Sequence, residues 1–207
     1  MSAAPPEEPS TREAGEADGL GEPVQAPQVV RELGDACVRF VEAALGLKLD
    51  FSPEMLPVLD HYVATRRKEL LSRPETIGLV ARATGAYFGE VVRRHFRSFW
   101  YTPSDDVSTW ELRFEPVYLA FCPIAVADDA ITHGDEDGVT ARFQLDDEDR
   151  EFVETRLFDL PSASDDEFFS FSTRLEVLEI AVDAIKARMM ASGLGEVAFT
   201  NDDYDEG

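Results

Sequence analysis

The spacing of the apolar residues changes twice along this 207-residue chain, and that change limits the folds it can adopt. From residue 28 to 99 apolar side chains recur at helical spacing, whereas Trp110, Leu112 and Phe114 alternate with polar residues as in a strand. Helical spacing returns after residue 146. This order predicts an α+β fold with N-terminal helices, a central antiparallel meander of three or four strands, and two C-terminal helices.

Three helices are expected before the strands. Gly46 ends the first, which begins near residue 28, because glycine readily takes the left-handed conformation that closes a helix. The second is expected to begin after Ser52. The third is expected to begin after Ser72, where Glu75 completes a capping-box pattern, and to continue to about Phe99.

A stripe of small residues runs along the third expected helix. Ala81, Gly85 and Gly89 are four residues apart and therefore share one face. Each glycine costs about 1 kcal/mol in a helix interior, so close packing against this face is the expected compensation. The neighbour is either another part of the chain or a second copy, and a homodimer through this face is one expectation.

The strands are expected to form hairpins. Residues 118–126 are apolar, and Pro123 within them predicts an edge strand or two short strands. Residues 139–145 alternate as in a strand, and the acidic, glycine-containing segment 135–138 has the composition of a hairpin turn.

Two further helices are expected to close the domain. One runs from about residue 147 to 158, and the other contains Leu175 and ends at Gly193. Ser164 and Glu167 form another capping-box pattern, which starts the last helix early or makes a separate turn.

These elements predict a single α+β domain over residues 28–195. Residues 1–27 are acidic and proline-rich with almost no large apolar side chain, so we expect them to be disordered. Residues 196–207 form an acidic C-terminal tail, expected to be solvated unless Val197, Phe199 and Tyr204 dock locally.

The chain has features of a cytoplasmic protein. Its first residues lack the basic start and apolar stretch of a secretory signal, and no apolar run reaches the length of a membrane helix. Cys37 and Cys122 lie among apolar residues and are expected to be buried free thiols.

Charge is distributed unevenly along the chain. The net charge is −23, from 42 acidic and 19 basic side chains, which argues against binding nucleic acid and disfavours anionic membranes. Residues 101–207 carry a net charge of −20, whereas residues 28–100 carry +2. The acidic half is either a binding surface for a basic protein or peptide or simply a means of keeping the protein soluble.

No catalytic motif stands out in the sequence. There is no glycine-rich phosphate loop, no nucleophile elbow and no paired Cys-x-x-Cys. His133 with Asp128 and Asp135 is the one local group resembling metal ligands, and a solvated turn is the expected reading. We therefore expect neither a metal nor a cofactor.

Four residues of the third expected helix are candidates for a binding site. Tyr87, Glu90, Arg93 and Arg94 lie within about two turns, so they form either a charged site or an ordinary ion pair along the helix. An apolar cluster is the other candidate for an interaction: Phe168, Phe169 and Phe171 are expected in the core or in an exposed docking patch.

Two segments resemble a family of uncharacterised bacterial domains of unknown function. One is residues 49–60, Leu-Asp-Phe-Ser-Pro-Glu-Met-Leu-Pro-Val-Leu-Asp, and the other is residues 85–94, Gly-Ala-Tyr-Phe-Gly-Glu-Val-Val-Arg-Arg, followed by Trp100. Met55 stands where the family often has serine. The resemblance implies a bacterial cytosolic α+β domain and brings no activity with it.

These observations favour a non-enzymatic binding or adaptor protein whose acidic surface engages a basic partner, as an immunity protein or a secretion chaperone would. The alternative is an enzyme of unknown reaction whose site lies near Tyr87, Glu90, Arg93 and His95. A structural domain that associates with itself through the Gly85 and Gly89 face is a third expectation.

Overall fold

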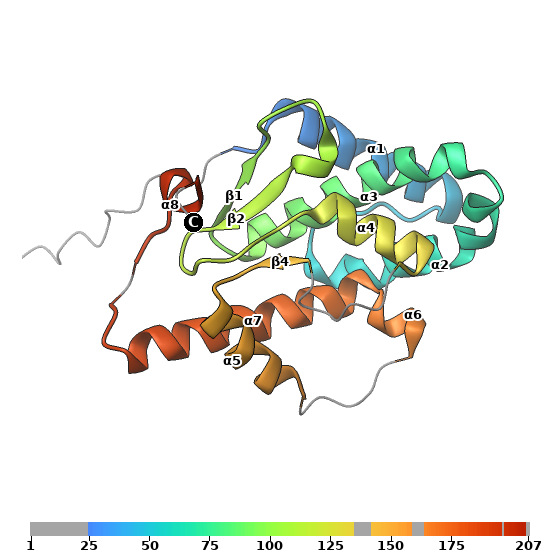
Figure 1. Ribbon diagram of the computed structural model, residues 1–207. Coiled ribbons are helices and arrows are strands. Elements are labelled where there is room, and N and C mark those ends of the chain that lie inside the picture. Colours follow the sequence, from blue (N-terminus) through green and yellow to red (C-terminus); the bar gives the residue numbers. More distant parts are fainter. Residues whose placement is uncertain (1–24, 135–141, 159–163, 196, 206–207) are drawn as a thin grey trace, which may run out of the picture.

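The computed structural model describes residues 25–134, 142–158, 164–195 and 197–205 (Figure 1). Three helices precede the sheet: α1 (Gln28–Leu45), α2 (Leu56–Leu71) and α3 (Pro74–His95). A short 3-10 turn, η1 (Pro53–Met55), leads into α2. Helix α3 packs against α1 on one side and against a later helix, α4 (Pro123–Thr132), on another. It is therefore the central element of the molecule.

Four short strands follow α3 in a meander. They are β1 (Ser98–Tyr101), β2 (Glu111–Phe114), β3 (Ala120–Phe121) and β4 (Phe143–Gln144), with η2 (Val107–Thr109) between the first two. Every neighbouring pair is antiparallel and the order is β1-β2-β3-β4. The pairing opposes Trp100 to Leu112, Leu112 to Phe121, and Phe121 to Phe143, so one row of apolar side chains crosses the sheet.

The remaining helices are α5 (Asp147–Phe158), α6 (Asp165–Phe168), α7 (Phe171–Ala191) and α8 (Asn201–Asp205). In Figure 1, α5 and α7 lie together at the bottom of the view, whereas α1 lies at the top. The α+β prediction is confirmed, with N-terminal helices, a central antiparallel meander and two long C-terminal helices, α5 and α7.

The prediction of strands over residues 118–126 is wrong beyond Phe121. Only β3 is extended, and Pro123 is the first residue of α4. Proline is favoured at this position because the amide it lacks would have no helical partner there. The Cys122 sulfur accepts a hydrogen bond from Ala125 N–H at 3.4 Å and caps the helix. Residues 135–141 lie outside the described part, and with them the expected hairpin turn and the first three residues of the strand expected over 139–145. In the described remainder of that range, Phe143–Gln144 form β4.

The ends of α3 also differ from the sequence expectation. The helix stops at His95 and the chain turns into β1, so the helix is shorter than predicted. Arg73, not Ser72, is the N-cap residue, and Ser72 Oγ donates to the Glu69 carbonyl oxygen of the preceding helix at 2.6 Å. The capping box at Ser164 is confirmed: its N–H and hydroxyl both donate to Glu167 Oε2 at 2.9 Å.

The small-residue face of α3 packs within the molecule. A side chain at Gly85 would lie 2.7 Å from Ile124 Cα of α4, and one at Gly89 would overlap the Trp100 ring of β1. The close-packed neighbours are therefore α4 and β1. In this fold the chain itself covers the face at Gly85 and Gly89, so these two glycines are not available to a second copy. The formation of a homodimer stays a prediction.

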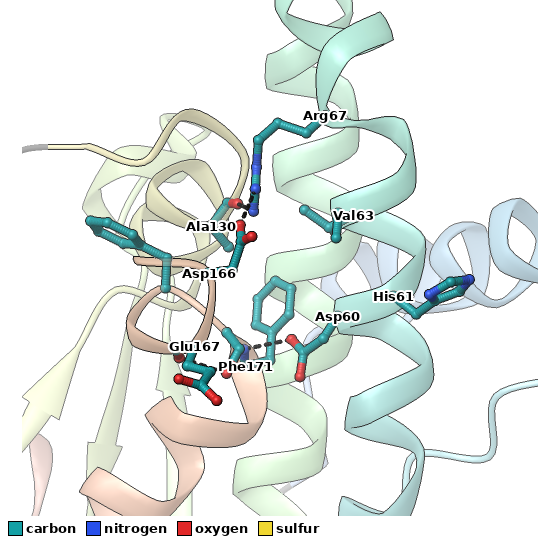
Figure 2. Close-up of a pocket in the computed structure, with 11 residues that line it drawn as sticks. Asp60, His61, Val63, Arg67, Ala130, Asp166, Glu167 and Phe171 are labelled. Atoms are coloured by element: carbon teal, nitrogen blue, oxygen red, sulfur yellow. Dashed lines mark hydrogen bonds and ion pairs between the residues drawn. The ribbon is translucent and has the colours of Figure 1, made fainter. Parts of the chain in front are cut away.

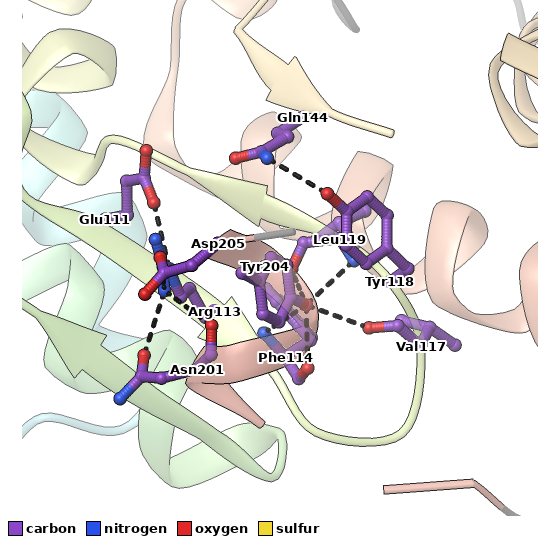
Figure 3. A network of polar contacts seen from close by, with 10 residues as sticks. All are labelled: Glu111, Arg113, Phe114, Val117, Tyr118, Leu119, Gln144, Asn201, Tyr204 and Asp205. Carbon is purple, nitrogen blue, oxygen red and sulfur yellow. Dashed lines mark hydrogen bonds and ion pairs between the residues drawn. The ribbon is translucent and has the colours of Figure 1, made fainter. Parts of the chain in front are cut away.

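The C-terminal segment is packed onto the sheet, so the expectation of a solvated tail is wrong there. Tyr204 of α8 is buried, and its hydroxyl accepts hydrogen bonds from the amides of Phe114 and Leu119 at 3.2 and 3.0 Å (Figure 3). The Arg113 guanidinium lies between Glu111, Asn201 and Asp205 in the same figure. The local docking considered for Phe199 and Tyr204 is confirmed.

Three smaller expectations have clear outcomes. Ala26 is buried in the core, so the ordered domain begins before residue 28, while residues 1–24 lie outside the described part. Both cysteines are free, Cys37 buried and Cys122 half-buried. Phe169 and Phe171 are buried and Phe168 is half-buried, so this cluster belongs to the interior and is not an exposed docking patch.

Candidate functional site

The two segments that carry the family resemblance lie against each other. The Phe51 ring stacks on the Tyr87 ring of α3 with 4.7 Å between centroids. Phe51 N–H donates to the Tyr87 hydroxyl oxygen at 3.0 Å. Burial raises the pKa of Tyr87 far above its ordinary value, so the phenol is neutral at physiological pH. Tyr87 therefore positions the turn at Phe51.

Glu90 is a buried anchor at the centre of the candidate site. Arg93 Nε donates to Glu90 Oε1 at 2.8 Å and Arg93 Nη2 donates to Oε2 at 3.0 Å. Trp100 Nε1 donates to the same Oε1 at 2.8 Å. The Glu90 side chain is only 3% exposed, so these charge-assisted bonds compensate for burying its charge. The predicted ion pair with Arg93 exists, and Glu90 also ties α3 to β1.

Arg94 is directed to a different neighbour from Arg93. Its guanidinium lies over the Phe51 ring, 4.3 Å from the centroid, and the residue is exposed. The Phe51 ring is thus held between Tyr87 and Arg94. Of the four predicted site residues, Tyr87 and Glu90 are buried supports, whereas Arg93 and Arg94 reach a shared cavity.

That cavity, which we call the basic cleft, has a volume of about 310 Å³. Arg93 and Arg94 of α3 line one side together with Phe51 and Glu90. The other side is formed by Arg31 and Asp35 of α1 and by Gln25 and Ala26, which precede that helix. Arg31 and Asp35 are not among the site residues predicted from the sequence, because only the packing of α1 on α3 brings them to the site. Phe51 lies within residues 49–60, and its spacing alone predicts no role for it.

The chemistry of the basic cleft suits binding better than proton transfer. Both Glu90 oxygens already accept hydrogen bonds, and the neutral Tyr87 hydroxyl accepts one from the backbone. Glu90 therefore has no oxygen without a donor, and Tyr87 is fully buried and outside the lining of the cleft, so neither is placed as a general acid or base toward a substrate in the cleft. His95, the fourth residue of the enzyme alternative, pairs instead with Glu179 of α7 at 2.8 Å.

A second cavity, of about 270 Å³, lies between α2, α4 and α6 (Figure 2). Asp60 of α2 reaches across it and accepts hydrogen bonds from Phe171 N–H at 2.7 Å and Ser172 N–H at 3.2 Å. Arg67 reaches from the same helix to the Asp166 carboxylate and the Ala130 carbonyl oxygen. These polar groups join helices distant in sequence, so we assign them a structural role.

The candidate metal group is only partly described. His133 is the C-cap residue of α4, in left-handed conformation, and its ring stacks on Phe169. Its Nε2 lies 3.3 Å from Asp166 Oδ1, while Asp135 falls outside the described part. Among the residues that the structure describes, no three histidine, cysteine or acidic side chains gather where they could hold a metal ion.

The acidic half of the sequence presents a surface on α5. Asp147, Glu151 and Glu154 are exposed and spaced by four and three residues, so they share one face of the helix. We call these three residues the acidic stripe. The opposite side of α5 buries Val153 and Asp149, and Asp149 pairs with Arg188 of α7. The stripe is therefore held outward by a helix whose inner side is anchored.

Comparisons with models of known protein families, with curated proteins and with solved structures found no match. In the parts of the chain described, no helix is both long and apolar enough to span a bilayer.

Proposed function

We propose that this chain is a non-enzymatic cytoplasmic binding or adaptor protein that engages a basic protein or peptide through the acidic stripe of α5. An immunity protein or a secretion chaperone would act in this way. The observation that carries the proposal is the alignment of Asp147, Glu151 and Glu154 along one exposed helix face. The two free thiols are compatible with a reducing cytoplasm.

Helix stability does not account for the whole stripe. Asp147 lies in the first turn of α5, where a negative charge is stabilised by the helix dipole. Glu151 and Glu154 lie beyond that turn. Like charges four residues apart, such as Asp147 and Glu151, destabilise a helix by a few tenths of a kcal/mol. A cationic partner would relieve this repulsion.

Neighbouring basic residues leave Asp147 and Glu151 of the stripe open to a partner. Arg188 pairs with Glu148 and Asp149, and Arg150 donates to the Phe143 carbonyl oxygen at 2.7 Å. In the described part of the chain, neither Asp147 nor Glu151 pairs with a lysine or arginine. The net charge of −20 on residues 101–207 would steer a cationic protein toward this half of the molecule.

The proposal is tested with the full chain as bait in a lysate of its own source cells. A variant with Asp147→Asn, Glu151→Gln and Glu154→Gln removes the stripe. A matched control, Glu42→Gln, Glu54→Gln and Glu75→Gln, removes the same charge from exposed positions in the first half of the chain. We expect wild type and control to retain the same basic protein, in a salt-dependent manner, and the stripe variant to lose it. Equal retention by all three, or no basic protein retained by any, overturns the proposal.

A further inference from the structure

The basic cleft carries more positive charge than its own carboxylates neutralise. Arg31, Arg93 and Arg94 line it together with Asp35 and Glu90. Glu90 is engaged by Arg93 and by the Trp100 indole. Asp35 is the other acid of the lining. A single carboxylate therefore faces the two guanidinium groups of Arg31 and Arg94.

In the described part of the chain, Arg31 and Arg94 form no ion pair. Within the described ranges, no carboxylate lies within salt-bridge distance of Arg31 or Arg94. The pKa of Asp50 is lowered mainly by its hydrogen bonds with Ser52, and the charge of Arg94 adds the smallest contribution. Ser52 N–H donates to Asp50 Oδ1 at 2.9 Å. The dipole of α3 favours cations at its last turn, which accounts for Arg94, but Arg31 belongs to α1 and lies at the other side of the cleft.

A strained turn at Phe51 forms part of the lining of the basic cleft. Phe51 has φ of 64°, in the left-handed region that a bulky side chain rarely adopts. The Tyr87 hydroxyl and ring hold it there. Gly34 of α1 makes room for it, since a Cβ at that position would lie 3.2 Å from Phe51 Cε1. Strain of about 1–3 kcal/mol at such a residue persists only where the surroundings impose it, and it concentrates at ligand sites.

We propose that the basic cleft binds a small oxyanion, a carboxylate or phosphate group, between Arg31 and Arg94. Guanidinium groups present paired donors that match the oxygens of these anions. The cavity of about 310 Å³ is at the small end of ligand pockets, and the net charge of −23 repels long polyanions. The inference does not depend on the role proposed for the acidic stripe.

The test compares two matched double variants of the full chain. Arg31→Gln with Arg94→Gln removes the proposed ligands, whereas Arg39→Gln with Arg82→Gln removes two exposed arginines from the same two helices outside the cleft. Each protein is titrated with inorganic phosphate and, separately, with acetate, at constant ionic strength maintained with sodium chloride. Circular dichroism verifies that each variant is folded.

The readout is the indole N–H resonance of Trp100 in a nitrogen-15 correlation spectrum. This group donates to Glu90 beneath the cleft, while Trp110 Nε1 donates to the Ser104 carbonyl oxygen at 2.7 Å and serves as an internal reference. We expect a saturable shift of Trp100 alone, in wild type and in the Arg39/Arg82 variant. The apparent Kd rises at least about tenfold in the Arg31/Arg94 variant.

The anion that saturates at lower concentration identifies the source as a phosphate or a carboxylate compound. Two results overturn the inference. One is a titration of the Arg31/Arg94 variant that matches wild type, and the other is the absence of a saturable Trp100 shift with both anions in wild type.

Discussion

Single carboxylates join parts of this molecule that are distant in sequence. Glu90 ties α3 to β1, and Asp60 of α2 accepts from the first amides of α7, more than a hundred residues away. Asp60 therefore does for α7 what an N-cap side chain does within its own helix. Burial raises the pKa of its carboxyl group, although the hydrogen bonds from Ser172 and Phe171 oppose that change.

The raised pKa of Asp60 predicts a specific dependence of stability on pH. Above its ordinary pKa the unfolded chain releases this proton more readily than the folded protein, so the stability that Asp60 contributes falls as pH rises through the folded pKa. Asp60→Asn keeps one of the two acceptor oxygens at the start of α7 and removes the titration, and the cost of the lost acceptor does not vary with pH. We expect the unfolding free energy of wild type minus that of Asp60→Asn to fall from about pH 3 to about pH 7.

Urea unfolding at several pH values measures this difference. Glu42→Gln, at an exposed position of α1, controls for the loss of one carboxylate. A difference that is constant, or that grows with pH, would show that the buried carboxyl does not titrate as described.

Two glycines of α3 predict opposite effects of the same substitution. A methyl group at Gly89 would overlap the Trp100 ring, which the hydrogen bond to Glu90 holds in place. Gly89→Ala is expected to destabilise the fold by about 1–3 kcal/mol. Gly78 has no atom within 4 Å of the added methyl, so Gly78→Ala is expected to stabilise it by up to about 1 kcal/mol. Unfolding temperatures that change in the same direction for both variants would contradict this packing.

At the scale of elements, the spacing of apolar residues predicted the long helices but could not distinguish the short helices from strands. The apolar stripes of α1 and α7 predicted their positions, because a helix of three or more turns repeats its pattern. The apolar run that became β3 and α4 is too short to show its period, and Pro123 fits an edge strand as well as a helix start. Whether this run forms a strand or a helix is decided by its packing against α3, which the sequence does not show.

The candidate site likewise contains residues that the sequence could predict and residues that it could not. Tyr87, Glu90, Arg93 and Arg94 share one helix, and their proximity follows from helical geometry alone. The contribution of α1 depends on a tertiary contact that no local pattern records, so Arg31 and Asp35 could not be predicted. The sequence also hides the positive φ of Phe51, because left-handed conformation is expected of glycine and asparagine.

The short helix α8 predicts a measurable contribution from one hydroxyl group. Tyr204→Phe keeps the ring and removes a hydroxyl that donates to the Phe114 carbonyl oxygen at 2.8 Å and accepts from the amides of Phe114 and Leu119, so we expect a loss of about 1 kcal/mol of stability. Those two amides are expected to exchange with solvent faster. Tyr101→Phe is the control, since its hydroxyl makes no hydrogen bond within the described chain while its ring contacts Arg113. Equal effects of the two substitutions would refute the role of α8.

At the scale of the whole molecule, opposite charges are concentrated on different elements. The acidic stripe lies on α5 and the basic cleft between α1 and α3, and Figure 1 places α1 and α5 at opposite sides of the view. The sequence arithmetic predicted an acidic second half and a slightly basic helical half. The structure adds which carboxylates are exposed together and which ones, such as Asp149 and Glu90, are occupied internally.

The central claim is that a cationic partner binds at the acidic stripe. The most direct test is to titrate the full chain with a short oligolysine peptide and record nitrogen-15 correlation spectra. The largest shifts are predicted for the α5 amides. They should weaken with salt, vanish in the Asp147/Glu151/Glu154 variant and persist in the Glu42/Glu54/Glu75 control. Shifts spread evenly over the acidic residues, or unchanged in the stripe variant, would contradict the claim.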